Sequence, residues 1–196
     1  MTRAHRSGTT FFLVLAIFLA AAAAQADVGV GDPMPRVDER LPDVRGRLTP
    51  LDMSGDEGTL VVFTSGSCAR AVALEETIVE LERTFARRLV RTILIDVDDS
   101  EPTEHGRLAA MRQRSDELGI RFPYLADDGA VARAFGVAAT PEAFLFDRGG
   151  KLVYRGAIAG GEAETHLKDA LEAMVAREPI PVAVTEARGC PVALSD

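Results

Sequence analysis

The sequence contains few of the residues that bind metal ions or form disulfides. Among its 196 residues are two cysteines, Cys68 and Cys190, and three histidines. His5 precedes an apolar run at the N-terminus, so only His105 and His166 remain in the rest of the chain. A four-ligand zinc site would need both of these histidines and both cysteines, at spacings unlike the usual paired motifs. We therefore predict no metal site and expect both histidines to be solvated.

A second cysteine is missing near Cys68. In the stretch SGSCARA, the third residue after Cys68 is Ala71, which excludes a Cys-X-X-Cys pair. Two cysteines allow only one intramolecular bridge. A domain of about 170 residues buries enough core to fold without a disulfide, so such a bridge need not serve to stabilise the fold.

Apolar runs long enough to span a bilayer are also missing. The run FFLVLAIFLAAAA is shorter than the roughly 20 residues that a transmembrane helix needs. It follows Arg3 and Arg6 and precedes the small-x-small sequence Ala24-Gln25-Ala26, which predicts a signal peptide over residues 1–26. The chain has no cysteine near this site and no adjacent arginine pair there, which argues against a lipoprotein or a twin-arginine signal. We expect a periplasmic or extracellular protein without stable membrane insertion.

Basic residues are fewer than acidic ones, with 22 Lys and Arg against 30 Asp and Glu. The formal net charge is −8, and it becomes −10 when the signal peptide is removed, because residues 1–26 contain Arg3 and Arg6 but no acidic residue. Such a surface repels nucleic acid, and no basic cluster is interleaved with aromatic residues. We predict no nucleic-acid partner. Outside the cytoplasm, both cysteines are in a compartment that permits disulfides.

The first half of the chain alternates between strand and helix patterns. Residues 27–58 are rich in Pro, Gly and Asp and predict a lead-in with a hairpin turned at Arg45-Gly46. The acidic stretch DVDDSEPTEHG lacks the EF-hand arrangement and is expected to be a solvated loop before the second helix. Hydrophobic periodicity predicts a buried strand at 59–64, followed by a helix with Leu74, Ile78, Leu81 and Phe85 on one face. A strand at 91–97 comes next, and then a helix with Leu108, Met111 and Leu118 on one side.

The second half adds a hairpin and a final helix. The predicted elements are a turn at 127–129, a short helical segment AVARAFGV, two strands joined at 147–150, and a helix with Leu167, Ala170, Leu171 and Met174 on one face that ends before Pro179. This order predicts an α/β fold: a central mixed β-sheet flanked by helices on both faces, with an N-terminal hairpin. We assign residues 27–178 to one domain and 179–196 to an extended tail that carries Cys190.

Several motifs resemble those of a known superfamily. The order of elements, the cysteine at the first strand-to-helix turn and Thr140-Pro141 before the hairpin resemble the thioredoxin superfamily. The stretches VVFTSGSC, FPYLAD, GVAATPEAFLFDRGGKLVYRGAI and TEARGC are similar to secreted bacterial redoxins related to alkyl hydroperoxide reductase and thiol-specific antioxidant proteins. The resemblance covers roughly residues 30–192.

This resemblance implies a thioredoxin-like fold and a set of site residues. Cys68 matches the reactive cysteine, Pro141 the cis-proline beside it, and Cys190 the cysteine that many such redoxins carry near the C-terminus. Thr140 precedes the cis bond, whose exposed backbone groups pair in this family with an extended peptide. Without the resemblance, Thr140 reads as an ordinary residue restricted by the following proline.

The chain departs from the family's motifs at several positions. Ala69 replaces the proline that commonly follows the reactive cysteine, and Ala71 replaces the second cysteine, which argues against a thioredoxin-like dithiol reductase. In the peroxidase pattern, Ser65 fits the hydroxyl position but Val61 stands where proline is expected. These differences argue against a dedicated peroxidase too.

Cys68 and the two serines of the SGSCARA stretch each have a functional and a structural interpretation. A predicted helix N-terminus stabilises a Cys68 thiolate, and Arg70 could add positive charge, but a free cysteine is also commonly a small buried residue. Ser65 and Ser67 could donate hydrogen bonds to a sulfur intermediate or a peroxide. Serines in this position are more often helix N-caps.

The sequence allows three alternative roles for Cys190. It could resolve an oxidised or mixed-disulfide Cys68, form a permanent structural bridge with it, or stay a free thiol in the tail. Bridging requires the two Cα atoms to lie within about 7 Å.

Two hypotheses of function follow. The first is a secreted redoxin that performs thiol-disulfide or peroxide-linked chemistry through Cys68 and Cys190. Its substrate would be a protein thiol or disulfide or a peroxide, an external reductant would reset it, and no cofactor is needed. The second is a non-catalytic binding or scaffold domain of the same fold with structural or idle cysteines.

Overall fold

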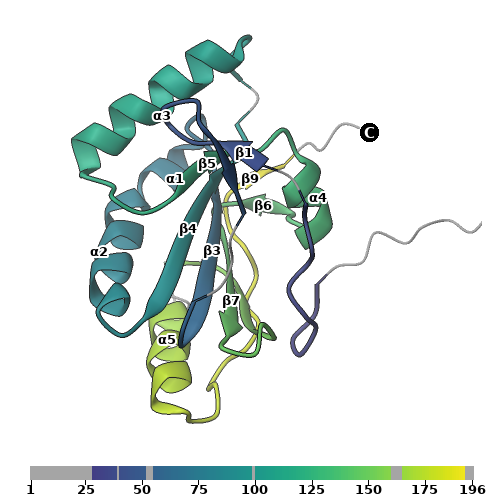
Figure 1. Cartoon of the computed structure of the whole chain (residues 1–196). Helices are drawn as coiled ribbons and strands as arrows, with labels where there is room; N and C mark the ends of the chain where they lie inside the picture. Colours follow the sequence, from purple (N-terminus) through teal and green to yellow (C-terminus); the bar gives the residue numbers. More distant parts are fainter. Residues whose placement is uncertain (1–27, 39, 52–54, 99, 160–164, 193–196) are drawn as a thin grey trace, which may run out of the picture.

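The structure, a computed structural model, describes residues 28–38, 40–51, 55–98, 100–159 and 165–192. A five-stranded sheet in the order β5-β4-β3-β7-β8 forms its centre (Figure 1). Strand β3 pairs with β4 in parallel and with β7 antiparallel, so the sheet is mixed, as predicted. The elements in chain order are β1 (Arg40–Pro42), β2 (Leu48–Pro50), β3 (Gly58–Thr64), α1 (Ala69–Val72), α2 (Glu75–Ala86), β4 (Val90–Asp96), α3 (Glu104–Leu118), β5 (Tyr124–Ala126), α4 (Ala130–Phe135), β6 (Ala139–Thr140), β7 (Glu142–Asp147), β8 (Leu152–Gly156), α5 (His166–Ala176) and β9 (Cys190–Pro191).

Strand β3 is buried along its whole length, as its apolar β-branched sequence predicts. Successive side chains of a strand point to opposite faces, so Leu60 and Val62 join one apolar cluster while Val61 and Phe63 join the other. The strand therefore ends at a fixed place between two cores, and the loop that carries Cys68 starts from there.

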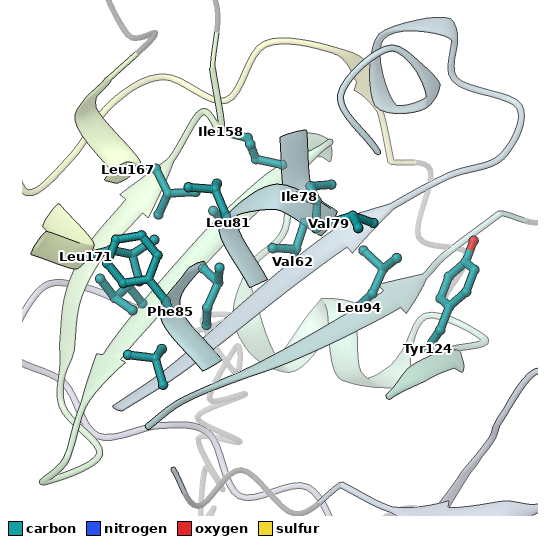
Figure 2. Packing of buried hydrophobic residues seen from close by; sticks show 14 of the residues in the cluster. Val62, Ile78, Val79, Leu81, Phe85, Leu94, Tyr124, Ile158, Leu167 and Leu171 are labelled. Atoms are coloured by element: carbon teal, nitrogen blue, oxygen red, sulfur yellow. The ribbon is translucent and has the colours of Figure 1, made fainter. Parts of the chain in front are cut away.

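Helices cover both faces of the sheet, which confirms the predicted layering. Apolar side chains of α2, α3 and α5 pack in the first cluster, including Ile78, Phe85 and Leu171 (Figure 2). On the other face, Phe135 of α4 packs edge to face against Phe63, with ring centroids 5.2 Å apart. The periodic apolar residues of the predicted helices thus form the core.

Three local features differ from the predictions. The helix after Cys68 is broken into a single turn, α1, and the longer α2. Strand β5 was not predicted, because three residues are too few to show a period. Helix α3 begins at Glu104, inside the stretch predicted to be a loop, where the Thr103 hydroxyl accepts a hydrogen bond from the Gly106 amide at 3.1 Å.

The N-terminal hairpin and the extended tail agree with the predictions. Strands β1 and β2 pair antiparallel, and Gly46 has the positive φ, 75°, that such a turn favours in glycine. The tail leaves α5 and runs beside β8 before β9 pairs with β6 (Figure 1). The predicted signal peptide, residues 1–26, lies outside the described residues. In the ranges that the structure describes, no helix is long and apolar enough to cross a membrane.

A buried ion pair orders the segment before β7. Arg155 Nη2 donates to Glu142 Oε1 at 2.8 Å, and Glu142 Oε2 accepts from the Ala138 amide at 3.2 Å. The two side chains are 13% and 3% exposed. The Glu142 carboxylate therefore joins Arg155 of β8 to the loop on which β6 lies. Removal of either partner would leave the other charge buried.

We expect Glu142→Gln to lower the free energy of unfolding by about 3–5 kcal/mol, because it removes the carboxylate charge that faces the buried Arg155 guanidinium. Urea denaturation followed by circular dichroism measures this change. The exposed Glu76→Gln on α2 is the control and should stay within about 0.5 kcal/mol of wild type. Equal stability of Glu142→Gln and wild type would show that the ion pair is not needed.

Candidate active site

Cys68 is buried at the junction of β3 and α1. It is the N-cap residue of α1, has extended backbone angles and is 1% exposed. Its amide donates to the Ser65 carbonyl at 3.2 Å, which closes the turn after the strand. The first amides of any helix lack intrahelical acceptors and favour an anion nearby. Since α1 has only one turn, its dipole is smaller than that of the long helix expected from the sequence.

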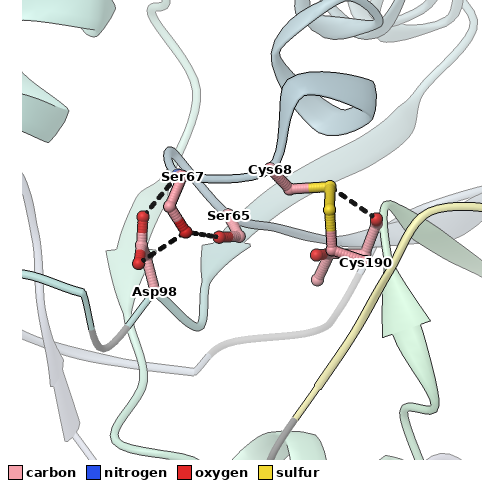
Figure 3. Close-up of a disulfide and its surroundings, with 6 residues drawn as sticks. Ser65, Ser67, Cys68, Asp98 and Cys190 are labelled. Carbon is pink, nitrogen blue, oxygen red and sulfur yellow. Dashed lines mark hydrogen bonds between the residues drawn. A yellow bond between two sulfur atoms is a disulfide. The ribbon is translucent and has the colours of Figure 1, made fainter.

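Cys68 forms a disulfide with Cys190, across 122 residues of sequence (Figure 3). The two Cα atoms are 5.8 Å apart, within the range for bridged cysteines. Of the three alternatives for Cys190, the free thiol is therefore wrong. Both a resolving and a permanently bridging cysteine agree with this pairing.

The Thr140-Pro141 peptide bond is cis, as the resemblance implies, and it lies beside the disulfide. The Thr140 carbonyl oxygen is 3.3 Å from Cys68 Sγ. A disulfide sulfur has no proton to donate, so this is a contact in the oxidised protein. After reduction, the Cys68 thiol can donate a hydrogen bond to the same oxygen.

The tail itself pairs with the backbone beside the cis-proline. In the two-stranded β6-β9 ladder, Thr140 is opposite Cys190 and Ala139 is opposite Pro191. A Cβ atom on Gly189 would overlap the Thr140 carbonyl group, so the absence of a side chain there lets the tail approach. Strand β9 thus occupies the edge that the resemblance assigned to an extended peptide.

Ser67 is hydrogen-bonded to Asp98, Ser65 is hydrogen-bonded to Ser67, and neither serine caps the helix. The Ser67 amide and hydroxyl donate to the two carboxylate oxygens of Asp98, at 2.6 and 3.0 Å, and the Ser65 and Ser67 hydroxyl oxygens are 3.0 Å apart (Figure 3). The predicted N-cap role is wrong, because Cys68 takes the cap position without a side-chain hydrogen bond. The structure thereby fixes the residue just before Cys68.

Asp98 was missed by the sequence reasoning, which treated its whole acidic stretch as solvated. A signal for it exists: β3 and β4 are parallel, so their carboxyl ends meet at one edge of the sheet. Polar residues just after each of these strands are therefore candidates for contact.

Residues 30–155 match the family model of the AhpC/TSA family, over more than half of the chain. The chain belongs to the AhpC/TSA family. This confirms the predicted redoxin of the thioredoxin superfamily. No curated protein has a sequence that matches this redoxin.

Solved structures share the fold of this chain. A conserved protein from Geobacillus kaustophilus has 26% identity and a TM-score of 0.76, with 85% of this chain and 93% of that chain covered. A hypothetical protein from Sinorhizobium meliloti 1021 also has 26% identity and a TM-score of 0.76, with 87% and 97% covered. A thiol:disulfide interchange protein from Chlorobium tepidum TLS, at 16% identity, shares the fold with a TM-score of 0.59, over 75% and 99% of the two chains.

Two aspartates with opposite pKa shifts support the Cys68 loop of this redoxin. Burial alone would raise the pKa of Asp98, but hydrogen bonds from Ser100 and Ser67 outweigh it and lower this pKa. For Asp96, which is 1% exposed, burial outweighs the attraction of Arg107 and raises the pKa. Asp96 accepts a hydrogen bond from the Asp98 amide at 2.9 Å.

The lowered pKa of Asp98 sets the pH range in which the loop is held. A lowered carboxyl pKa means that the folded state favours the anion. The stabilisation that the Asp98 carboxylate gives the folded state is therefore fully present above the ordinary pKa near 3.8, and it is lost as the pH falls through the folded-state pKa. At neutral pH, the redoxin therefore holds Ser67 by a carboxylate.

Other predicted site residues lie apart from the sulfurs. The Arg70 guanidinium donates to the Ala159 carbonyl at 2.9 Å, and within the described part of the chain no hydrogen bond or ion pair joins it to Cys68. His105 is exposed on α3, and His166 is half-buried at the start of α5. Among the described residues, no three His, Cys, Asp or Glu side chains form a group suited to a metal ion.

Proposed function

We propose that this redoxin is a secreted thiol oxidoreductase in which Cys68 is the nucleophile and Cys190 the resolving cysteine. The observation that carries this proposal is the Cys68–Cys190 disulfide beside the cis Thr140-Pro141 bond. In a protein with no adjacent dithiol, this bridge is the product that two-cysteine chemistry would leave. Protein thiols or disulfides are the proposed substrates, and an external dithiol is the proposed reductant.

The reaction proceeds in two exchange steps and a reset. The Cys68 thiolate attacks a substrate disulfide, which forms a mixed disulfide and releases one substrate thiolate. The Cys190 thiolate then attacks the sulfur of Cys68, forms the Cys68–Cys190 bond and releases the second substrate thiolate. Two electrons from the external dithiol reopen this bond, and the reductant leaves as a disulfide.

A peroxide is the second candidate substrate, because motifs of the chain resemble those of redoxins related to alkyl hydroperoxide reductase. In that case the Cys68 thiolate would be oxidised to a sulfenic acid with release of an alcohol or water, and Cys190 would condense with it and release water. Two features favour disulfide exchange. Val61, at the position of the motif's proline, is buried in β3, and the Ser65 hydroxyl is paired with that of Ser67.

Substrate contacts are proposed for four residues. Thr140 and Pro141 present backbone next to the sulfurs and would contact the substrate directly. Ser65 and Arg70 remain proposed substrate-binding residues, and their polar groups would first have to leave Ser67 and the Ala159 carbonyl. Secretion through residues 1–26 would bring the domain, 27–178, and the tail, 179–196, into a compartment where disulfides persist.

The Cys190→Ser variant tests this function. We expect the reduced variant to stop at a mixed disulfide on Cys68 when it meets a small disulfide, while reduced wild type goes on to the Cys68–Cys190 bond. Intact-mass measurement and peptide mapping distinguish the two products. A parallel arm with hydrogen peroxide should leave a sulfenic acid on Cys68 of the variant only if peroxide is a substrate.

A scaffold role predicts the opposite result. Neither oxidant would then drive bond formation in reduced wild type, and Cys68 would react no faster than an ordinary thiol with a pKa near 8.5. The exposed Glu76→Gln on α2 serves as the control for changes in the chain that leave both sulfurs in place.

A further inference from the structure

The tail is attached to the domain at a second place, a few residues before Cys190. Residues 183–185 run beside the edge strand β8. The Arg155 amide donates to the Ala183 carbonyl, and the Thr185 amide donates to the Arg155 carbonyl, both at 3.0 Å. This attachment does not involve the disulfide, so its bonds remain when the sulfurs separate.

The Thr185 side chain completes this attachment. Its hydroxyl oxygen accepts from the Ala157 amide at 2.9 Å and lies 2.8 Å from the hydroxyl of Tyr154. Tyr154 donates to the Ala157 carbonyl at 2.5 Å, so its proton is already used and Thr185 must donate to it. Each of the two hydroxyls therefore both donates and accepts a hydrogen bond, and Tyr154 is fully buried.

Gly156 allows the close approach of the tail. A Cβ atom at this position would overlap the Thr185 carbonyl and hydroxyl groups, and the backbone φ of Gly156, 132°, is one that other residues rarely adopt. The edge of β8 is thus shaped to receive Thr185. We call this group, Tyr154, Gly156, Ala157 and Thr185, the tail anchor.

By contrast, the attachment next to Cys190 is slight. The β6-β9 ladder contains two residue pairs, extended by one hydrogen bond from the Val192 amide to the Ala138 carbonyl at 3.1 Å. Gly189 and Pro191 are exposed. A pairing this short gains little free energy compared with the backbone entropy it costs, so the disulfide is what keeps β9 in place.

We propose that Thr185 is a positioning residue, which keeps Cys190 near Cys68 after the disulfide opens. This inference rests on the proposed function, in which Cys190 must return to attack Cys68. Only residues 186–189 separate Thr185 from Cys190, so the two Cα atoms stay within about 18 Å even when this arm is extended. Resolution is an intramolecular step in any case, and the anchored arm raises the effective concentration of the Cys190 thiol near Cys68.

The length of the free arm determines how far the effective concentration of the Cys190 thiol falls when the anchor is lost. Without the anchor, one hydrogen bond from the Arg155 amide to the Ala183 carbonyl remains. A single bond of this kind does not offset the entropy of an ordered arm, so the nearest fixed point is Ile180, which packs on the core, or the end of α5 at Ala176. The free arm then grows from 186–189 to 181–189 or 177–189. Effective concentration falls roughly as the −3/2 power of length, which predicts a decrease of about three- to sixfold.

The test measures the equilibrium between the Cys68–Cys190 bond and the dithiol in glutathione redox buffers, with alkylation and mass analysis of the full chain. Thr185→Pro removes both the hydroxyl and the amide donor, and we expect its effective concentration to be about three- to sixfold below wild type. Thr185→Val removes only the hydroxyl and should show a smaller decrease. Thr185→Ser, which keeps the hydroxyl, and Val184→Thr, at a side chain that is 58% exposed, should match wild type.

A kinetic measurement separates positioning from a general loss of structure. The first step, attack of Cys68 on a small disulfide, should keep its wild-type rate in Thr185→Pro, while resolution slows by the same factor as the equilibrium shifts. If Thr185→Pro does not fold, Thr185→Val decides the question. Wild-type values for Thr185→Pro, or for Thr185→Val in that case, would overturn the inference. Failure of reduced wild type to form the bond at all would instead overturn the proposed function.

Discussion

Replacing Cys68 with serine will lower thiol-disulfide turnover at least about a hundredfold, to the rate of the uncatalysed mixture. The thiolate is the attacking species, and a serine hydroxyl is not ionised near neutral pH. Cys190 cannot take over the role, because it lies in the tail, while Cys68 has the first amides of α1 and the cis-proline backbone beside it. Turnover of a disulfide-bonded protein substrate with an excess of external dithiol measures the effect.

Two controls make this result specific. The double variant Cys68→Ser with Cys190→Ser gives the background of the fold without thiols, and the single Cys68→Ser variant should differ from it only by the reactivity of one ordinary thiol. Circular dichroism should show that all variants keep the fold, since a domain of this size does not depend on the bridge. Turnover that survives Cys68→Ser would mean that Cys68 is not the nucleophile.

The external thiol should attack Cys190 and leave Cys68 as the departing thiolate. Cys68 is 1% exposed in the oxidised protein, whereas Cys190 is half-buried in the exposed tail. Exchange depends on access to the sulfur and on the stability of the leaving thiolate, and both favour attack at Cys190. We expect at least about nine in ten of the first adducts on Cys190.

This preference can be read from a short reaction with a monothiol. Oxidised protein is mixed with glutathione, quenched with acid within the first turnover, alkylated and mapped by peptide mass. The expected products carry glutathione on Cys190 and the alkyl group on Cys68. In the unfolded protein, where both sulfurs are equally accessible, the adducts should divide about evenly. Adducts mainly on Cys68 in the folded protein would show that the tail moves away before attack.

Much of the fold could be read from local patterns. The buried run of β3, the apolar face of α2 and the turn glycines of both hairpins each carry a signal within a few residues, because side-chain periodicity and backbone restrictions act locally. The resemblance added Cys68, Pro141 and Cys190 as a set. The break between α1 and α2 and the short β5 escaped, because one turn or three residues leave no period to detect.

The sequence by itself determined which chemistry is available: one cysteine at a strand-to-helix turn, one in the tail, and no adjacent dithiol. Only the tertiary structure decided that the two sulfurs are bonded, that Asp98 holds Ser67, and that Thr185 anchors the tail. The physical reason is that these contacts join residues far apart in the chain. These contacts form only because the sheet brings the ends of β3 and β4 and the edge of β8 into place. No pattern within a short stretch of sequence encodes which distant residues will meet.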